Sequence, residues 1–149
     1  MSEDLVVAKI KKSAVSEIWV VVKEYAGRPS CDVREYFHPA DSPDWLPTRK
    51  GASIPPELLG QAVDAIDEMS TRSTVEMVRE LPRGKKARLR FAICEYQKHI
   101  YGEIRTYYVE ETDSKDWKPG KGVTFPLAII GQLAEAVRIA EDAMPKRSI

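Results

Sequence analysis

Hydrophobic and polar residues alternate through residues 18–25. Ile18, Val20 and Val22 fall on one face, while Trp19 and its alternate neighbours fall on the other. Alternation with a period of two is typical of a half-buried β-strand. The Gly and Pro of residues 26–29 favour a turn, so we expect residues 31–37 to form an antiparallel partner strand.

The spacing changes to three and four residues after Pro55 and Pro56. Prolines suit the first turn of a helix, and a single apolar stripe follows, formed by Leu58, Leu59, Ala62, Val63 and Ile66. This pattern predicts a helix that buries one face. Residues 38–50 are rich in proline and small polar residues and predict a loop, with a short strand at residues 51–54.

The same pattern returns 71 residues later. Arg34 is matched by Arg105 and Pro55 by Pro126, and Glu-Tyr, Lys-Gly and Gly-Gln pairs recur at the same offset. The chain therefore holds a duplicated module. For the second copy we expect strands at 89–96, 101–109 and 123–125, and a helix over 126–143. Trp45 and Trp117 are 72 residues apart, which we attribute to a change of loop length.

Two segments lie outside the repeated pattern. Residues 1–17 alternate weakly and fit either a mobile arm or an edge strand. Residues 70–88 fit a linker, an extension of the first helix, a short helix or an extra strand. The predicted organisation is therefore an arm or edge strand at 1–17, a first repeat at 18–69, a linker at 70–88 and a second repeat at 89–149. Between residues 81 and 91 lies a basic cluster without acids, made of Arg83, Lys85, Lys86, Arg88 and Arg90.

Composition indicates a soluble globular protein, with 43% hydrophobic and 31% charged residues. The 149 residues contain 23 basic and 23 acidic side chains, so any site for a polyanion must arise from local clustering. Cys31 and Cys94 are not equivalent in the two repeats, and neither lies in a metal-binding or disulfide motif. With no secretory leader and no apolar run long enough for a bilayer, we expect an intracellular protein that does not contact membranes.

Enzyme chemistry is not indicated. His38 and His99 lie at non-equivalent positions, without a nucleophile or metal ligand at motif spacing. The recurring acids are Glu24 and Asp32 with their counterparts Glu95 and Glu103, and we expect them to pair with Arg34 and Arg105 and fix the hairpins. We therefore expect no catalytic residue, no metal site and no cofactor.

The motifs of both repeats resemble the C-terminal domain of the transcriptional coactivator positive cofactor four. The resemblance rests on three segments of the first copy, residues 23–28, 32–37 and 49–54, and on their counterparts around Glu95-Tyr96, 103–108 and 117–125. It implies a four-stranded antiparallel sheet followed by a helix, in a family that dimerises through its helices and presents two curved sheets to single-stranded DNA. Here the fold class would be α+β, with two β-β-β-β-α repeats packed as an intramolecular pseudo-dimer.

Single-strand binding needs cations along a groove for phosphates and flat aromatic faces for bases. In the first copy the candidates are Trp19, Lys23, Tyr25, Arg28, Arg34, Tyr36, Phe37, Arg49 and Lys50. In the second copy they are Arg90, Tyr96, Lys98, Arg105, Tyr107, Tyr108, Lys118 and Lys121. Strict alternation places Phe37 and Tyr108 on the side of Val33 and Ile104, so they join the others only if a bulge intervenes.

The second copy departs from the family pattern. Cys94 stands where the first copy has Lys23, His99 stands where it has Arg28, and Ile18 and Leu89 replace a position that is basic in the family. We therefore expect the first copy to dominate phosphate binding, with help from the basic segment 83–90.

The function expected is largely sequence-independent single-stranded DNA binding, of the transcriptional coactivator type, in transcription, replication or repair. One alternative is a protein-interaction scaffold or transcription cofactor with a weakened nucleic-acid face, and another is RNA binding. Expected partners are single-stranded DNA and proteins of transcription or replication. We expect a monomer with an internal pseudo-twofold axis, located in the cytoplasm or nucleoid, or in the nucleus of a eukaryote.

Overall fold

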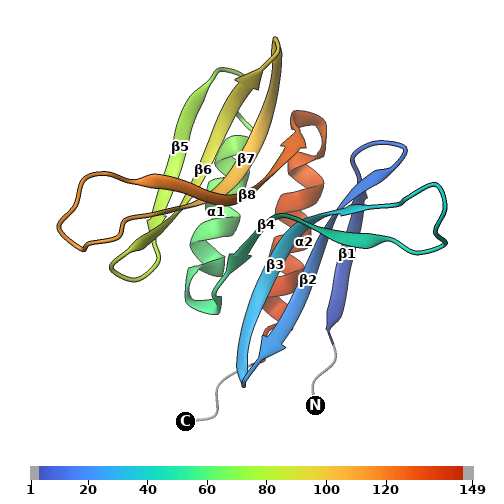
Figure 1. Cartoon of the computed structure of the whole chain (residues 1–149), viewed down its shortest axis with the longest axis horizontal. Helices are drawn as coiled ribbons and strands as arrows, with labels where there is room; N and C mark the ends of the chain where they lie inside the picture. The colour runs from blue at the N-terminus through green and yellow to red at the C-terminus, as the bar shows by residue number, and fades with distance from the viewer. Residues whose placement is uncertain (1–3, 146–149) are drawn as a thin grey trace.

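Two four-stranded antiparallel sheets, each followed by a helix, make up the computed structural model, which describes residues 4–145 (Figure 1). The strands are β1 (Leu5–Lys11), β2 (Ser16–Tyr25), β3 (Arg28–Phe37), β4 (Leu46–Ile54), β5 (Glu76–Pro82), β6 (Ala87–Tyr96), β7 (His99–Tyr108) and β8 (Lys118–Pro126). The helices are the single 3-10 turns η1 (Pro56–Leu58) and η2 (Leu127–Ile129) and the α-helices α1 (Leu59–Met69) and α2 (Ile130–Ala143). Residues 1–3 of the predicted arm and 146–149 of the predicted second repeat lie outside the described part.

Both sheets are meanders, in the orders β1-β2-β3-β4 and β5-β6-β7-β8. Two-residue turns join β2 to β3 and β6 to β7. Ala26 and Gly27 have φ values of 53° and 76°, and Gln97 and Lys98 have values of 50° and 68°. Positive φ at both central residues is the geometry that matches the right-handed twist of a tight hairpin. The turns therefore set a continuous register along both hairpins.

The helices are exchanged between the two halves. Helix α1 packs against β5 and β6 of the second sheet, and α2 packs against β1 and β2 of the first. The helices also pack against each other, and β4 lies beside β8 in the middle of the molecule (Figure 1). Buried side chains from both sheets and both helices form one core. The predicted α+β class, with two β-β-β-β-α repeats and packed helices, is confirmed.

The apolar stripes predicted for the helices are buried in this core. In α1, Leu59, Ala62 and Ile66 are fully inaccessible to solvent, as are Leu133 and Val137 of α2. The repeat offset also holds here, because α1 and α2 begin 71 residues apart. Among the described residues, neither helix combines the length and the apolar character needed to cross a bilayer.

Both segments placed outside the repeats contain edge strands. Residues 5–11 pair with β2, and residues 76–82 pair with β6. Segment 70–88 is therefore not a linker, and each repeat begins earlier than predicted. A bulge interrupts the pairing at Val7 and at Val78, the equivalent position. Because a bulge breaks the period of two, the alternation that would have identified these strands is lost.

The last strand of each sheet is longer than predicted, beginning at Leu46 and at Lys118. Three residues of β4, 48–50, oppose the single residue Glu35, whereas two residues of β8 oppose Thr106. The second copy has one residue more in the preceding loop and one fewer in this bulge. The spacing of Trp45 and Trp117 therefore reflects a loop change that a strand bulge compensates, which the sequence analysis had excluded.

Candidate nucleic-acid interface

The faces of the two sheets that point away from the helices carry most of the predicted site residues. In β2, burial of Ile18, Val20 and Val22 against the core turns Trp19 and Lys23 to the outer face. Arg34 lies directly across from Trp19, and Arg105 lies across from Arg90 in the second sheet. The alternation read from the sequence thus gives the correct face for these residues.

Arg34 and Arg105 are held in the same way in both sheets. Arg34 donates to Asp32 through Nε (3.0 Å) and Nη2 (3.1 Å), and to the carbonyl of Thr48 on β4 (2.8 Å). Arg105 donates to Glu103 (3.0 Å) and to the carbonyl of Gly120 (2.8 Å). The hydrogen bond from Glu103 raises the pKa of Arg105 above its ordinary value. Each sheet therefore carries an immobilised guanidinium at its centre.

Glycine makes room for these guanidinium groups. A Cβ at Gly51 would lie 2.6 Å from Cζ of Arg34, and one at Gly122 would lie 2.8 Å from Cζ of Arg105. Since each glycine pairs with its arginine across the strands, any side chain there would displace the arginine. Of the acids expected to pair with the arginines, Asp32 and Glu103 do so. Glu24 and Glu95 form no such pair among the described residues.

An aromatic stack covers part of the first sheet. The rings of Trp19 and Tyr36 are parallel, with centroids 3.9 Å apart, and the Lys9 ammonium lies 4.3 Å from the Trp19 ring. The Trp19 indole also donates to Glu17 (2.9 Å). Tyr36 is only 9% exposed. A base therefore has little access to these two rings unless Lys9 moves aside.

In the second sheet, arginines replace this arrangement. Arg90, the counterpart of Trp19, lies 3.9 Å from the Tyr107 ring centroid, and Arg88 lies 4.0 Å from that of Trp117. Both arginines bind Glu80, at 2.6 Å from Arg88 and 2.9 Å from Arg90. Burial opposes ionisation of Glu80, but these hydrogen bonds outweigh it and lower the pKa of its carboxyl group.

The sequence analysis did not select Lys9, Arg88 or Trp117 as site residues. Arg88 shares the face of Arg90 by alternation, and that signal was present in the sequence. The contact of Arg88 with Trp117 joins β6 to a loop about thirty residues away, so local spacing could not reveal it.

The most accessible aromatic side chains lie at the ends of the hairpins. Tyr25 is 86% exposed and Tyr96 is 63% exposed. The exposed residues Arg28 and Lys98 lie in or beside the same turns. Each hairpin tip thus presents an aromatic ring next to a cation.

Phe37 and Tyr108 lie at the other ends of β3 and β7, each 41% exposed. The pairing of β3 with β2 is continuous, and the bulge falls in β4 instead. Alternation therefore keeps Phe37 on the side of Val33. These rings are accessible because they end their strands, and they do not share the face of Arg34.

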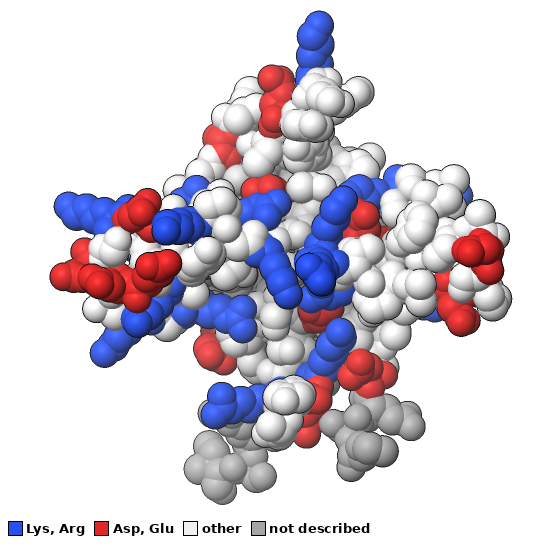
Figure 2. Space-filling view, in the orientation of Figure 1, with Lys and Arg blue, Asp and Glu red and all other residues white. Residues whose placement is uncertain are grey.

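The remaining predicted cations are Lys23, Arg49, Lys50, Lys118 and Lys121. Lys23 lies 3.5 Å from Asp32, and Lys118 lies 3.9 Å from Glu110. Arg49, Lys50 and Lys121 are exposed residues of the bulges in β4 and β8. In the view of Figure 2, Lys and Arg side chains gather over the middle of the molecule, where β4 and β8 lie.

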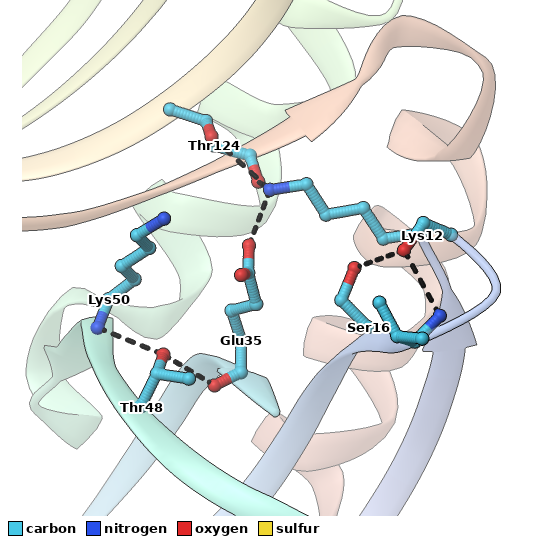
Figure 3. A network of polar contacts seen from close by, with 8 residues as sticks. Lys12, Ser16, Glu35, Thr48, Lys50 and Thr124 are labelled. Carbon is cyan, nitrogen blue, oxygen red and sulfur yellow. Dashed lines mark hydrogen bonds and ion pairs between the residues drawn. The ribbon is translucent and has the colours of Figure 1, made fainter. Parts of the chain in front are cut away.

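Two equivalent contacts join the halves beneath this region. Lys12 donates to the carbonyl of Thr124 on β8 (3.0 Å) and binds Glu35 (2.5 Å), as Figure 3 shows. Arg83, at the position of Lys12 in the second repeat, donates to the carbonyl of Ser53 on β4 (2.8 Å). Each β-turn at the edge of one sheet thus binds the last strand of the other.

The cysteines are poorly placed for nucleophilic chemistry. Burial raises the pKa of Cys31 from 9.0 to about 12, with Asp32 adding to the effect. Burial and the neighbouring Glu103 raise the pKa of Cys94 as well. Both thiols therefore remain protonated at neutral pH. No group of three or more potential metal ligands occurs within residues 4–145.

Comparison with known proteins identifies relatives of this architecture. The family described as Transcriptional Coactivator p15 (PC4) matches residues 14–63. An orthorhombic crystal structure of BPSL1147, a PC4 homolog from Burkholderia pseudomallei K96243, is 34% identical, with a TM-score of 0.44, and the match covers 49% of this chain and 97% of that one. The tetragonal form is 36% identical, with a TM-score of 0.43 and coverages of 47% and 100%. No curated protein matches. Because the identity extends over almost the whole relative, this chain belongs to the PC4 family.

Proposed function

We propose that this protein binds single-stranded DNA, largely independently of sequence, across its two sheets. The proposal rests on one arrangement that occurs twice, an immobilised arginine at the centre of a sheet with an exposed tyrosine at the hairpin tip. Arg34 and Tyr25 form it in the first half, and Arg105 and Tyr96 in the second. Membership of the PC4 family supports the same function.

The chemistry of the arrangement suits a single strand. Cations at fixed positions attract phosphates without reading bases. Each base that stacks on an accessible aromatic ring adds about 1–3 kcal/mol to binding. A duplex has no free base faces to offer to Tyr25 or Tyr96, so we expect a preference for single strands.

The two sheets contribute unequally. The first carries Lys23 and Arg28 where the second carries Cys94 and His99, so phosphate binding along the hairpin is stronger on the first. The second compensates with Arg88 and Arg90, although Glu80 balances part of their charge.

The test is fluorescence anisotropy of a labelled oligo-dT at low and moderate salt, with an equally long duplex as competitor. Tyr25→Ala and Tyr96→Ala remove exposed rings with little effect on stability. Ile139→Ala is the matched control, because this side chain is 47% exposed on helix α2, away from the sheets. We expect salt-sensitive binding that duplex does not displace and that only the tyrosine variants weaken.

The rival function is protein interaction. It is favoured by the Trp19 ring, which Lys9 and Tyr36 already cover, and by the acids that neutralise several face cations. Absence of oligonucleotide binding at any salt concentration would favour it. An oligo-rU titration in parallel decides whether RNA binds equally well.

The proposal includes no catalysis and no cofactor. The protein would act as one chain with an internal pseudo-twofold axis, in transcription, replication or repair. Its site of action would be inside the cell, in the nucleoid or nucleus, where single-stranded DNA is exposed.

A further inference from the structure

A groove of about 430 Å³ opens at the end of the second sheet. It lies between the turn that joins β5 to β6, residues 83–86, and the loop that joins β7 to β8, residues 109–117, which projects to the left in Figure 1. Lys85, Arg88, Lys115, Glu80, Ser114 and Trp117 supply its polar and aromatic lining. Arg88 pairs with Tyr107 across the strands, so the groove continues the outer face of the sheet.

The groove has an excess of positive charge. Its only acid among the described lining residues is Glu80, which is already bound by Arg88 and Arg90. Lys85 and Lys115 form no ion pair within the described part of the chain. The Arg88 side chain is 40% exposed, and its guanidinium has more donors than Glu80 and the Trp117 stack occupy. Three cations are thus available to a single anionic group.

The acids of the neighbouring loop point elsewhere. Glu110, Glu111 and Asp116 line a separate small hollow with Lys118. Lys115 and Trp117 alternate with these acids and line the groove. The loop therefore segregates its charges, and the repulsion that its acids would exert on an anion is directed away from the groove.

The first half has no equivalent. Ala14 and Glu17 occupy the positions of Lys85 and Arg88, and Pro43 occupies that of Lys115, allowing for the longer second loop. Three cations are replaced by two uncharged side chains and one acid. The groove is therefore a feature of the second half alone, although the fold around it is repeated.

We infer that this groove binds a phosphate group of a nucleic-acid strand where the strand leaves the second sheet. This inference rests on the proposed function and adds a contact to it. Lys85, Lys115 and Arg88 bind the phosphate, and Trp117 holds the Arg88 guanidinium in place. Because only one half carries the groove, it gives the pseudo-symmetric protein one distinct end, and a bound strand takes a single orientation.

The experiment compares Lys85→Ala with Lys86→Ala, adjacent substitutions that each remove one charge. Only Lys85 lines the groove. Affinity for a long oligo-dT is measured over a series of salt concentrations, and Lys115→Ala is measured in parallel. Loss of one phosphate contact lowers the slope of log affinity against log salt by about 0.7, which weakens binding roughly fivefold at about 0.1 M salt. We expect this change for Lys85→Ala and Lys115→Ala, and a smaller one for Lys86→Ala.

Two further arms identify the phosphate and its location. Oligonucleotides of equal length with and without a terminal phosphate distinguish a terminal group from an internal phosphodiester. Titration of isotopically labelled protein should shift the Trp117 indole N–H resonance, assigned with Trp117→Phe. Equal effects of Lys85→Ala and Lys86→Ala, with an unmoved Trp117 signal, would overturn the groove assignment while oligonucleotide binding persists. Failure of the wild-type protein to bind any oligonucleotide would overturn the proposed function and this inference together.

Discussion

Asp67 and Arg138 occupy the same position in the two repeats, 71 residues apart, and bind each other across the two helices at 3.0 Å. In a pair of identical repeats, a residue at this position would face its own copy and repel it. The two copies have instead acquired opposite charges. The helix contact is therefore specific for pairing the first half with the second, which is an advantage of carrying both in one chain.

This ion pair should show a small coupling energy. Both side chains are about half exposed, at 50% and 44%, so the expected contribution is at most about 1 kcal/mol and should fall with added salt. A double-mutant cycle with Asp67→Ala and Arg138→Ala, measured by urea unfolding, gives the value. The control cycle pairs Asp67→Ala with Glu135→Ala, which contacts Arg138 but not Asp67. Equal coupling in both cycles would contradict a direct contact.

Neither half should fold as a monomer by itself. Each helix covers the sheet of the other half, so a chain cut between Arg72 and Ser73 leaves both sheets with an uncovered apolar face. We expect fragments 1–72 and 73–149 to form a 1:1 complex when mixed, with circular dichroism close to that of the intact protein. Light scattering on the separate fragments is the check. A folded, monomeric fragment would show that the helices are not exchanged.

Lys98→Gly should stabilise the protein by about 1 kcal/mol. Lys98 has a φ of 68°, a conformation that costs an L-residue with a side chain roughly 1–2 kcal/mol and that Gly27 adopts freely at the equivalent turn. Urea unfolding measures the difference. The reverse substitution, Gly27→Lys, should destabilise by a similar amount, and space for its side chain is available. Identical stability of Lys98→Gly and wild type would mean that the turn relaxes differently.

Gly51→Ala should displace Arg34 and weaken DNA binding. The new Cβ would collide with the guanidinium, which must then leave Asp32 and the Thr48 carbonyl. We expect a loss of about 1 kcal/mol in stability and roughly fivefold in oligo-dT affinity at about 0.1 M salt. Gly131→Ala is the control, because a Cβ there meets no neighbour and lies within helix α2. Unchanged affinity of Gly51→Ala would remove Arg34 from the binding face.

Stability should decline at alkaline pH through Cys31. The thiol ionises near pH 9.0 in the unfolded chain and near about 12 in the folded protein, so the unfolded state loses its proton first as pH rises. The contribution of Cys31 is intact below pH 9 and is lost progressively above it, by roughly 2 kcal/mol at pH ~10.5. The measurement is the difference in unfolding free energy between wild type and Cys31→Val at pH about 8 and about 10.5, which cancels the titration of other groups. A difference that stays constant with pH would refute the assignment.

The sequence by itself determined the duplication, the hairpins and the helices, because their signals are local. Alternation at Ile18, Val20 and Val22 identifies a strand and its buried face, and the stripe from Leu59 to Ile66 identifies a helix. A single offset through both copies then predicts that whatever one half forms, the other forms also. Arg34 and Arg105 were found in this way.

Tertiary structure decided everything that depends on residues distant in the chain. Strands β1 and β5 contain bulges that erase their alternation, so pairing with β2 and β6 defines them. The exchange of the helices, the contact of Arg88 with Trp117 and the ion pair of Asp67 with Arg138 each join segments that no local period connects. Local spacing fixes the face on which a side chain lies. Its neighbour across that face is fixed by packing, which is a property of the whole chain.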